Sequence, residues 1–359
     1  MSGDPTGTAA VSATAAMVLD LATAAGCAEV EVLVERGTTA LTRFANSAIH
    51  QNVTDTMTTV RLRVHHDGRT TAASTTVPGR AGAAGLVERA MASVRHAPRD
   101  LDWPGLTPAA TTPPTGQPHA DPATATAGPH RRAEVVAAFV AAAGGHTTAG
   151  YCSVDTRCAA FVNSAGRMVA DVTTTAAFDG IVRASAGTAA PADGLARAAS
   201  SRLADLDGAA LGAVARTKAL AARNPVDLPP GRYQVLLEPT AVADLIDVMA
   251  VYGFSGRALA ERCSFVELGA AQFDRAVTLV DDPAAAATAG WCFDAEGGVR
   301  ERIELVRAGV THAVANDRRT AARLGTASNG RAVPGAGWWG PIPINLAMLP
   351  APQPGPATG

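Results

Sequence analysis

The chain has 359 residues, of which 47% are hydrophobic and 17% are charged, and its formal net charge is −2. This length allows two domains of ordinary size, and the apolar fraction is enough for a sizeable core. The weak negative charge does not favour binding to nucleic acid or to an acidic membrane surface, because both are negatively charged and bind positively charged protein surfaces.

The first predicted element is an amphipathic helix within residues 11–27 (VSATAAMVLDLATAAGC). This stretch has the small residues and the terminal cysteine of a lipoprotein signal, but no positive charge precedes it and Asp20 interrupts its apolar region. Val11, Ala15 and Val18 recur at helical spacing instead. No apolar run approaches the roughly 20 residues that a membrane span needs. We therefore expect a cytoplasmic protein without a membrane segment.

Strands follow this helix. Val30, Val32 and Val34 alternate with polar residues, which is the period of a half-buried strand. Asn46-Ser47 indicates a polar bend inside the next strand, and Asp67-Gly68 predicts a tight hairpin turn. The predicted strands cover residues 30–34, 43–52, 60–64 and 69–74, and a helix over 81–95 closes this unit.

A long segment rich in Pro, Thr and Ala, residues 104–130, comes next and has no apolar period. We expect it to be an extended loop. Beyond it the sequence predicts a helix over 131–143, a β-rich block over 150–190 with a hairpin turn at 163–166, and a helix near 194–222.

Asn224-Pro225 and Pro229–Gly231 break the chain, and we place a domain boundary there. The predicted domains are residues 1–225 and residues 226–359. The second domain opens with a strand at Tyr233–Glu238. A helix over 239–251 follows, with Val242, Leu245, Ile246 and Met249 as its buried stripe, and strands are predicted at 277–280, 291–293 and 303–306.

These patterns predict an α+β fold. In the first domain, helices pack on mostly antiparallel sheets. The second domain is a curved antiparallel β domain with one packed helix, 239–251. Asp281-Asp282-Pro283 is interpreted as a structural turn, with acid/base chemistry or cation binding as the alternative. Trp338-Trp339 is interpreted as a packing pair.

Five segments carry a resemblance to a known family. They are RFANSAIHQN (43–52), RNPVDLPPGRYQVLLEP (223–239), GFSGRALAERCSF (253–265), VTLVDDP (277–283) and NDRRTAARLGTASNG (316–330). Each segment alone is a weak signal, but all five occur in the order of the TldD/PmbA family of metallopeptidases. The resemblance covers nearly the whole chain and implies the two-domain fold described above.

The zinc motif of that family is missing. The helix 239–251 resembles the helix that carries His-Glu-x-x-x-His in the catalytic subunit, but this chain has Ala243, Asp244, Leu245, Ile246, Asp247 and Val248 there. Two imidazoles on one helix face can hold a zinc ion, whereas Asp244 with Val248 cannot. The catalytic branch takes a third ligand, a cysteine, from a segment near its C-terminus, and we expect the second domain here to be short at that end.

The resemblance therefore points to the TldE (PmbA) branch of the family. It implies a subunit that is not catalytic by itself and that forms a heterodimer with a TldD-like, zinc-bearing partner. Such a peptidase acts on unfolded or modified peptides and takes part in peptide maturation, including removal of leader peptides. We expect no metal and no cofactor in this chain, with zinc in the partner.

Two further hypotheses concern particular residues. If the chain helps to hold a peptide, the predicted contributors are Gly253, Ser255, Gly256 and Arg257, because glycines permit close backbone approach and an arginine can hold a carboxylate. The alternative is that both glycines only cap the helix and that Arg257 is solvated. A different class of function, an independent hydrolase, would use Cys263 or Ser255 as its nucleophile.

Overall fold

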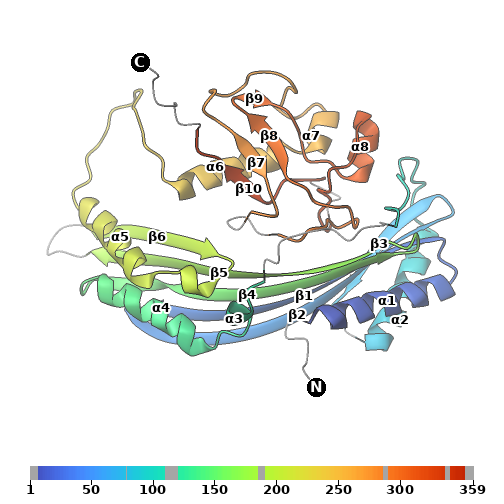
Figure 1. Cartoon of the computed structure of the whole chain (residues 1–359), viewed down its shortest axis with the longest axis horizontal. Coiled ribbons are helices and arrows are strands. Elements are labelled where there is room, and N and C mark those ends of the chain that lie inside the picture. Colours follow the sequence, from blue (N-terminus) through green and yellow to red (C-terminus); the bar gives the residue numbers. More distant parts are fainter. Residues whose placement is uncertain are drawn as a thin grey trace, which may run out of the picture.

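The computed structural model describes residues 7–77, 79–109, 120–184, 191–285, 290–335 and 340–351. The chain forms one long, curved antiparallel sheet with helices on one face, and a second part with a smaller sheet lies over the opposite face (Figure 1). The predicted α+β class is confirmed. The Trp338-Trp339 pair lies outside the described residues.

The large sheet has six strands in the order β3-β2-β1-β4-β5-β6. Every neighbouring pair is antiparallel. Its strands are β1 (Glu29–Ala45), β2 (Ala48–His66), β3 (Arg69–Thr75), β4 (Thr147–Asn163), β5 (Met168–Ala184) and β6 (Ala192–Ser200). The sequence patterns found β1 to β5, but they made β1 and β2 too short, because the far ends of these two strands are too exposed to keep the apolar alternation.

Two predicted turns fall where the chain reverses. Asp67 and Gly68 have φ angles of 50° and 70° and join β2 to β3, as predicted. Asn46 and Ser47 also have positive φ angles, 49° and 60°. Two consecutive residues in this region make the tight turn that matches the twist of a hairpin. The predicted bend is therefore the hairpin turn between β1 and β2.

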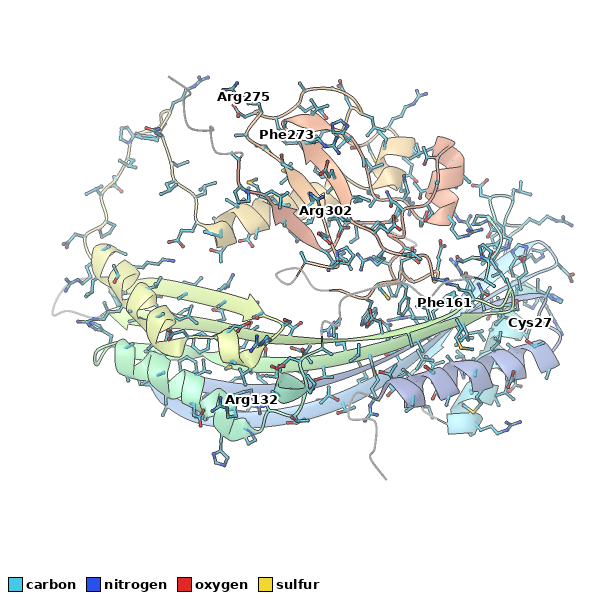
Figure 2. All side chains as sticks on the ribbon, in the orientation of Figure 1. Cys27, Arg132, Phe161, Phe273, Arg275 and Arg302 are labelled. Atoms are coloured by element: carbon cyan, nitrogen blue, oxygen red, sulfur yellow. The ribbon has the colours of Figure 1, made fainter. Side chains whose placement is uncertain are left out.

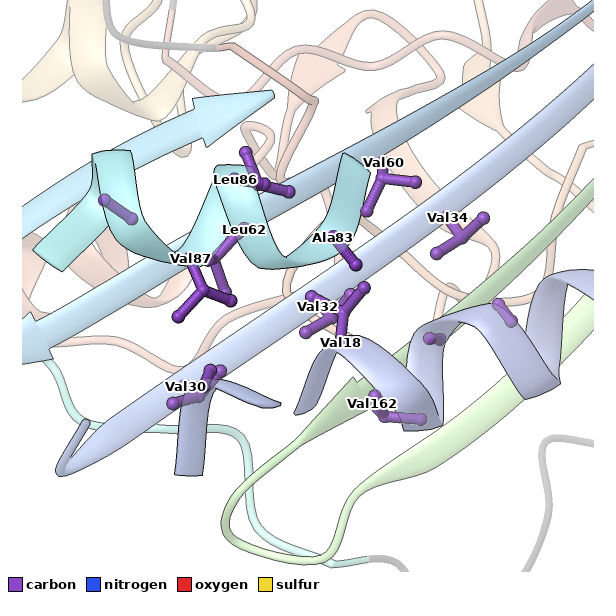
Figure 3. Close-up of a cluster of buried hydrophobic side chains, with 14 of the residues drawn as sticks. Val18, Val30, Val32, Val34, Val60, Leu62, Ala83, Leu86, Val87 and Val162 are labelled. Carbon is purple, nitrogen blue, oxygen red and sulfur yellow. The ribbon is translucent and has the colours of Figure 1, made fainter. Parts of the chain in front are cut away.

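Two groups of helices cover one face of the sheet. Helices α1 (Thr8–Ala24) and α2 (Gly79–Val94) pack on one half, where Val18 and Leu86 belong to the same buried cluster as Val32 of β1 (Figure 3). On the other half lie the helices α3 (Pro122–Ala125), α4 (Pro129–Ala142) and α5 (Gly208–Ala221) and the 3-10 turn η1 (Leu203–Asp205). The predicted loop 104–130 thus contains α3 and the first two residues of α4.

Helices α4 and α5 approach closely because α5 has glycines at the contact. A Cβ on Gly208 would lie 2.1 Å from the carbonyl oxygen of Val135, and one on Gly212 would lie 2.5 Å from that of Phe139. Phe139 in turn packs edge-on against Phe44 of β1, with ring centroids 5.7 Å apart. The second half of the sheet therefore has an aromatic core.

The predicted helix at 194–222 is partly wrong. Residues 192–200 form β6, and α5 begins only at Gly208. In β6 every second residue is buried, namely Ala192, Gly194 and Ala196. This is the alternation of a strand, but the buried side chains are small. In a chain so rich in alanine this alternation is hard to distinguish from a helix, because alanine suits helices and loops alike.

The second part of the chain has helices α6 (Pro239–Tyr252), α7 (Gly256–Ala260) and α8 (Arg318–Leu324). Its antiparallel sheet has the order β10-β7-β8-β9. The strands are β7 (Leu279–Asp281), β8 (Ile303–Arg307), β9 (Val310–Thr311) and β10 (Leu346–Met348). Helix 239–251 and the strands near 277–280 and 303–306 are confirmed, but residues 291–293 contribute only an isolated bridge from Phe293 to Val299.

The predicted strand at Tyr233–Glu238 is wrong. The segment is irregular and exposed, and the side chain of Leu236 is 98% accessible. A strand needs a neighbour to satisfy its backbone groups, and no strand of the described residues pairs with this segment. Leu245 of α6 is also 56% exposed, so the predicted stripe is buried only at Ile246 and partly at Val242 and Met249.

An apolar cluster joins the two parts. Phe161 and Leu33 of the large sheet pack with Phe293 from the second part, on the face that the helices leave open (Figure 2). Gly297 lies so close that an added Cβ would be 2.4 Å from the Phe161 ring. No helix in the described ranges is long and apolar enough to cross a membrane.

Candidate functional site

The helix that resembles the family's zinc helix borders a cavity that lies between the second part of the chain and one end of the large sheet. Helix α6 begins at Pro239, where a proline costs no helical hydrogen bond, and ends at Tyr252, with Gly253 as its C-cap. Its residues Ala243, Asp244 and Asp247 line a cavity of about 1030 Å³. The sequence therefore placed the helix correctly, and the folded chain places its polar face beside a cavity that is open to solvent.

Three elements wall this cavity. Helix α6 forms one side with Val242 and Ile246. The end of the large sheet forms a second side, with Thr174 of β5 and Ser200 of β6, and β10 forms a third. The remaining lining residues are mostly small or apolar, among them Leu237, Ala276, Val277, Ile344, Leu349 and Pro350. Asp244 and Asp247 are the charged side chains among the described lining residues, so the cavity carries a negative field.

The residues at α6 do not fit the zinc ion that the family resemblance implies. The two positions of the motif histidines hold Ala243 and Val248, which offer no ligand atom. Two carboxylates on one helix, Asp244 and Asp247, lack the imidazole or thiolate ligands that zinc sites use. In the parts of the chain that the structure describes, no three His, Cys, Asp or Glu side chains gather closely enough to hold a metal ion.

The predicted peptide-binding residues lie directly after α6, and most of them are buried. A Cβ on Gly253 would lie 2.0 Å from the Phe265 ring, and one on Gly256 would lie 2.0 Å from Oδ1 of Asn316. The Gly256 amide donates to the carbonyl of Ala315 at 2.9 Å. The geometry thus explains both glycines by close packing inside the domain.

Arg257 differs from these glycines because it borders a second cavity. Its Nε donates to Glu261 at 2.8 Å, and its stem packs against Gly340. A role for Arg257 in binding a carboxylate stays a prediction.

The two predicted nucleophiles have different surroundings. The side chain of Ser255 is fully buried, so a substrate reaches it only if the domain opens. Cys263 is exposed, and its thiol donates to the carbonyl of Ala258 at 3.5 Å. Cys152 and Cys158 lie on the same strand, β4, six residues apart, and that spacing of about 20 Å excludes a disulfide between them.

A second cavity, of about 760 Å³, lies at the junction of the two parts and was not predicted. Arg63 of β2 contacts Glu31 of β1 and donates to Glu296 of the second part at 3.0 Å. Arg319 of α8 forms a bidentate pair with Asp100, at 2.7 and 2.6 Å. Arg63 and Glu296, and likewise Arg319 and Asp100, are separated by more than 200 residues in the sequence, so spacing gave no signal for these two pairs.

Burial and charge shift the pKa values of this junction. Desolvation raises the pKa of Glu31, although Arg63 opposes the shift. The two carboxylates beside Arg63 raise the pKa of its guanidinium against the opposing effect of burial. Hydrogen bonds from Arg319 lower the pKa of Asp100 to about 2. The contacts of Arg319 with Asp100 and of Arg63 with Glu296 join the two parts, which suits a structural role for this junction.

Comparisons with known proteins place this geometry in a family. The model of the PmbA/TldA metallopeptidase domain 1 matches residues 30–94, and that of the PmbA/TldA metallopeptidase C-terminal domain matches residues 230–356. Together they cover more than half of the chain. A search of curated protein sequences finds no match.

Solved structures share the fold at low sequence identity. A candidate modulator of DNA gyrase from Thermotoga maritima superposes with a TM-score of 0.82 at 18% identity, covering 93% of this chain and 76% of that chain. A candidate modulator of DNA gyrase from Bacteroides thetaiotaomicron superposes with a TM-score of 0.80 at 19% sequence identity, and the match covers 94% of this chain and 76% of that chain. TldE from Thermococcus kodakarensis superposes with a TM-score of 0.80 at 18% sequence identity, and the match covers 92% of this chain and 76% of that chain. At these identities the likeness shows the fold alone.

Proposed function

Because the chain belongs to the PmbA/TldD family of metallopeptidases, we propose that it is a TldE-like subunit that supports a zinc-bearing, TldD-like partner. In this proposal the partner cleaves unfolded or modified peptides, and this chain shapes the shared cavity and holds peptide. The chain does not cleave peptide bonds alone.

The observation that carries the proposal is the composition of α6. The helix is present and borders a cavity, yet the motif positions hold Ala243 and Val248 in place of ligands. A peptidase that relied on zinc at this helix would lose its metal with its histidines. A subunit that keeps the cavity and omits the metal is what a supporting role requires.

An exposed apolar segment supports the heteromeric part of the proposal. Val226, Leu228, Val235 and Leu236 lie in the connection between α5 and α6 and are 67 to 98% exposed. The connection runs away from the body of the protein before it returns to α6 (Figure 1). Contiguous exposed apolar residues are typical of interaction sites, and a TldD-like subunit is the partner that we propose for them.

Co-expression tests this function. The chain is produced with the product of a neighbouring gene that encodes His-Glu-x-x-x-His, and the purified proteins are assayed on unfolded peptides. We expect the two chains to co-purify and to cleave only together. A matched complex whose partner lacks the motif histidines should assemble but stay inactive. Full activity from this chain alone would overturn the proposal, and its loss in Cys263→Ala or Ser255→Ala would assign the independent hydrolase.

A further inference from the structure

The second cavity, at the junction of the two parts, has arginine as its commonest charged residue. Its lining includes four carboxylates and six arginines of the described residues, namely Arg61, Arg63, Arg99, Arg257, Arg319 and Arg323. Phe161, labelled in Figure 2, belongs to the same lining. The volume of about 760 Å³ is within the range of small-molecule sites. Both parts of the chain therefore present cationic groups to one space of that size.

Strand β2 places two of these arginines on the open face of the large sheet. Arg61 and Arg63 are two residues apart on the strand and therefore lie on the same face. Arg61 is opposite Leu33 of β1 in the register, and Leu33 packs in the apolar cluster that joins the two parts. The face of the sheet that meets the second part is thus the face that carries these guanidinium groups.

Helix α8 supplies two more arginines and holds the segment that carries another. Arg319 and Arg323 are four residues apart and lie on one side of the helix. Arg319 donates to Asp100 at 2.7 and 2.6 Å. Arg323 donates to Asp102 at 2.5 Å. These contacts fix the segment beside α8 in which Arg99 directly precedes Asp100.

The carboxylates of the cavity are less accessible than its arginines. Glu31, Glu296 and Asp100 pair with arginines of the lining and are 4 to 12% exposed. Asp317 accepts from the amide of Thr320 at 2.7 Å. The five lining arginines that form ion pairs are 30 to 44% exposed. The charge that a ligand meets in this cavity is therefore mainly positive.

The arginines also have donors for a further anion. Arg99 is exposed and forms no ion pair within the described ranges. A guanidinium has five N–H donors, of which Arg61 uses Nε for Glu35 at 2.9 Å. Arg323 directs Nε and Nη2 to Asp102. Both of these ion pairs are exposed, and exposed pairs contribute little to stability. A multivalent anion can therefore add to them or compete with them.

The chemistry of the guanidinium indicates the class of ligand. Its planar fork matches the oxygens of a phosphate group in two parallel hydrogen bonds. A chain of phosphates contacts several arginines at once, so each contact raises the effective concentration for the next. The chain as a whole has a net charge of −2 and does not attract polyanions generally. Any such binding must come from a local cluster.

We propose that the junction cavity binds a di- or triphosphate group between Arg61 and Arg99 of the first part and Arg323 of the second part. The bound anion tightens the contact between the two parts. This site is separate from the proposed peptidase function, because no residue of α6 lines the cavity.

Isothermal titration of the purified chain at low salt and without magnesium tests the ligand class. The probes are inorganic tripolyphosphate, ATP and inorganic phosphate. We expect one site per chain, with tripolyphosphate binding at least about tenfold more tightly than phosphate. Equal affinity for tripolyphosphate and ATP would identify the phosphate chain as the ligand, and tighter binding of ATP would identify a nucleotide. Either result supports the site, whereas no preference over phosphate overturns it.

Variants assign the binding to both parts of the chain. Arg99→Gln and Arg323→Gln should each weaken tripolyphosphate binding about tenfold, since each removes charge-assisted hydrogen bonds. The control Arg95→Gln replaces an exposed arginine that lies four residues before Arg99 and outside the cavity, and it should keep the affinity. If Arg323→Gln does not fold, Arg323→Lys replaces it, because lysine keeps the charge and loses the fork. Unchanged affinity in the Arg99 and Arg323 variants would overturn the proposal.

Hydrogen exchange tests whether the anion bridges the two parts. Saturating tripolyphosphate should slow amide exchange at 290–300 and in β2 and should raise the melting temperature, because it binds only the folded, joined state. Sodium chloride at equal ionic strength is the control and should do neither. Tripolyphosphate that binds without slowing exchange at either segment would show that the anion does not link the two parts.

Discussion

Arg331 and Asp281 form an ion pair that is completely buried in the second part of the chain. Arg331 Nε donates to Asp281 Oδ2 at 2.5 Å, and both side chains are inaccessible to solvent. The guanidinium also donates to the backbone carbonyls of Asn329, at 2.7 Å, and Glu301. One arginine thus ties β7 to the loop that precedes β8 and to the loop that follows α8.

Removing one member of this pair should destabilise the protein strongly. Arg331→Met leaves the Asp281 carboxylate buried without its counterion, and we expect a loss of about 3 to 5 kcal/mol in the free energy of unfolding. Adding Asp281→Asn should recover part of that loss, because no charge then remains uncompensated. Urea unfolding of both single variants and the double variant measures the coupling. If the losses in unfolding free energy of the two single variants simply add in the double variant, the two side chains are not energetically coupled and this prediction is wrong.

The contact of Arg63 with Glu296 should hold the second part against the large sheet. In Glu296→Gln we expect faster amide hydrogen exchange at 290–300 and in β2, because a neutral amide pairs less strongly with the guanidinium. The control is Glu304→Gln, whose ion pairs with Arg302 and Arg307 are on the surface. The control should change stability by no more than about 0.5 kcal/mol. Unchanged exchange in Glu296→Gln would show that apolar packing alone fixes the junction.

Asp294 should make stability fall as the pH rises. Burial, helped by the nearby Glu296 carboxylate, raises the pKa of Asp294 to about 6 from 3.8. The folded state therefore binds more protons between these values, so this group's contribution is full below about 3.8 and is lost as the pH passes through about 6. We expect Asp294→Asn to flatten the pH dependence of stability in that window. An unchanged slope would assign the effect to other groups.

Asp100 should act in the opposite direction and in a different window. Its pKa is lowered to about 2 by hydrogen bonds from Arg319, so its contribution is present above about 3.8 and is lost as the pH falls towards 2. Arg319→Gln should therefore lower the free energy of unfolding at pH 5, and near pH 2 it should change that free energy very little. Unfolding at the two pH values, compared with the wild-type chain, provides the measurement.

Alanine at Gly253 should be costly, because its Cβ would occupy the space of the Phe265 ring. We expect a loss of roughly 1 to 3 kcal/mol, as for overpacked cores. The matched control is Gly85→Ala in α2, where the nearest atom is the end of Arg89 at 3.5 Å. That change should stabilise the helix by about 0.5 to 1 kcal/mol. If both variants melt at the same temperature, packing does not explain Gly253.

Zinc content gives a direct test of the motif interpretation. The purified chain should hold well below one equivalent of zinc by elemental analysis, because Ala243 and Val248 offer no ligand at α6. The purified complex with its proposed partner should contain about one zinc per heterodimer, removable with a chelator. About one tight zinc per isolated chain would overturn this expectation.

Local patterns determined much of the secondary structure. Alternating valines identified β1, the Asp67-Gly68 turn identified a hairpin, and Pro239 with its following apolar spacing identified α6. These features depend on residues close in sequence, whose spacing fixes which face is buried. The absence of histidines at α6 could also be read from the sequence, because all residues of this motif lie within one short segment of the chain. The boundary near residue 225 stays a prediction.

Only the tertiary structure decided which distant groups meet. From the sequence we interpreted Asp281 as part of a turn, but in the folded chain it is buried against Arg331, which lies fifty residues further along the sequence. Tyr233–Glu238 has the composition of a strand and is not one, since a strand exists only where a neighbour accepts its hydrogen bonds. The cavity beside α6 likewise needs β5, β6 and β10 together. Composition sets the propensity of each segment, whereas long-range pairing and burial select its partner.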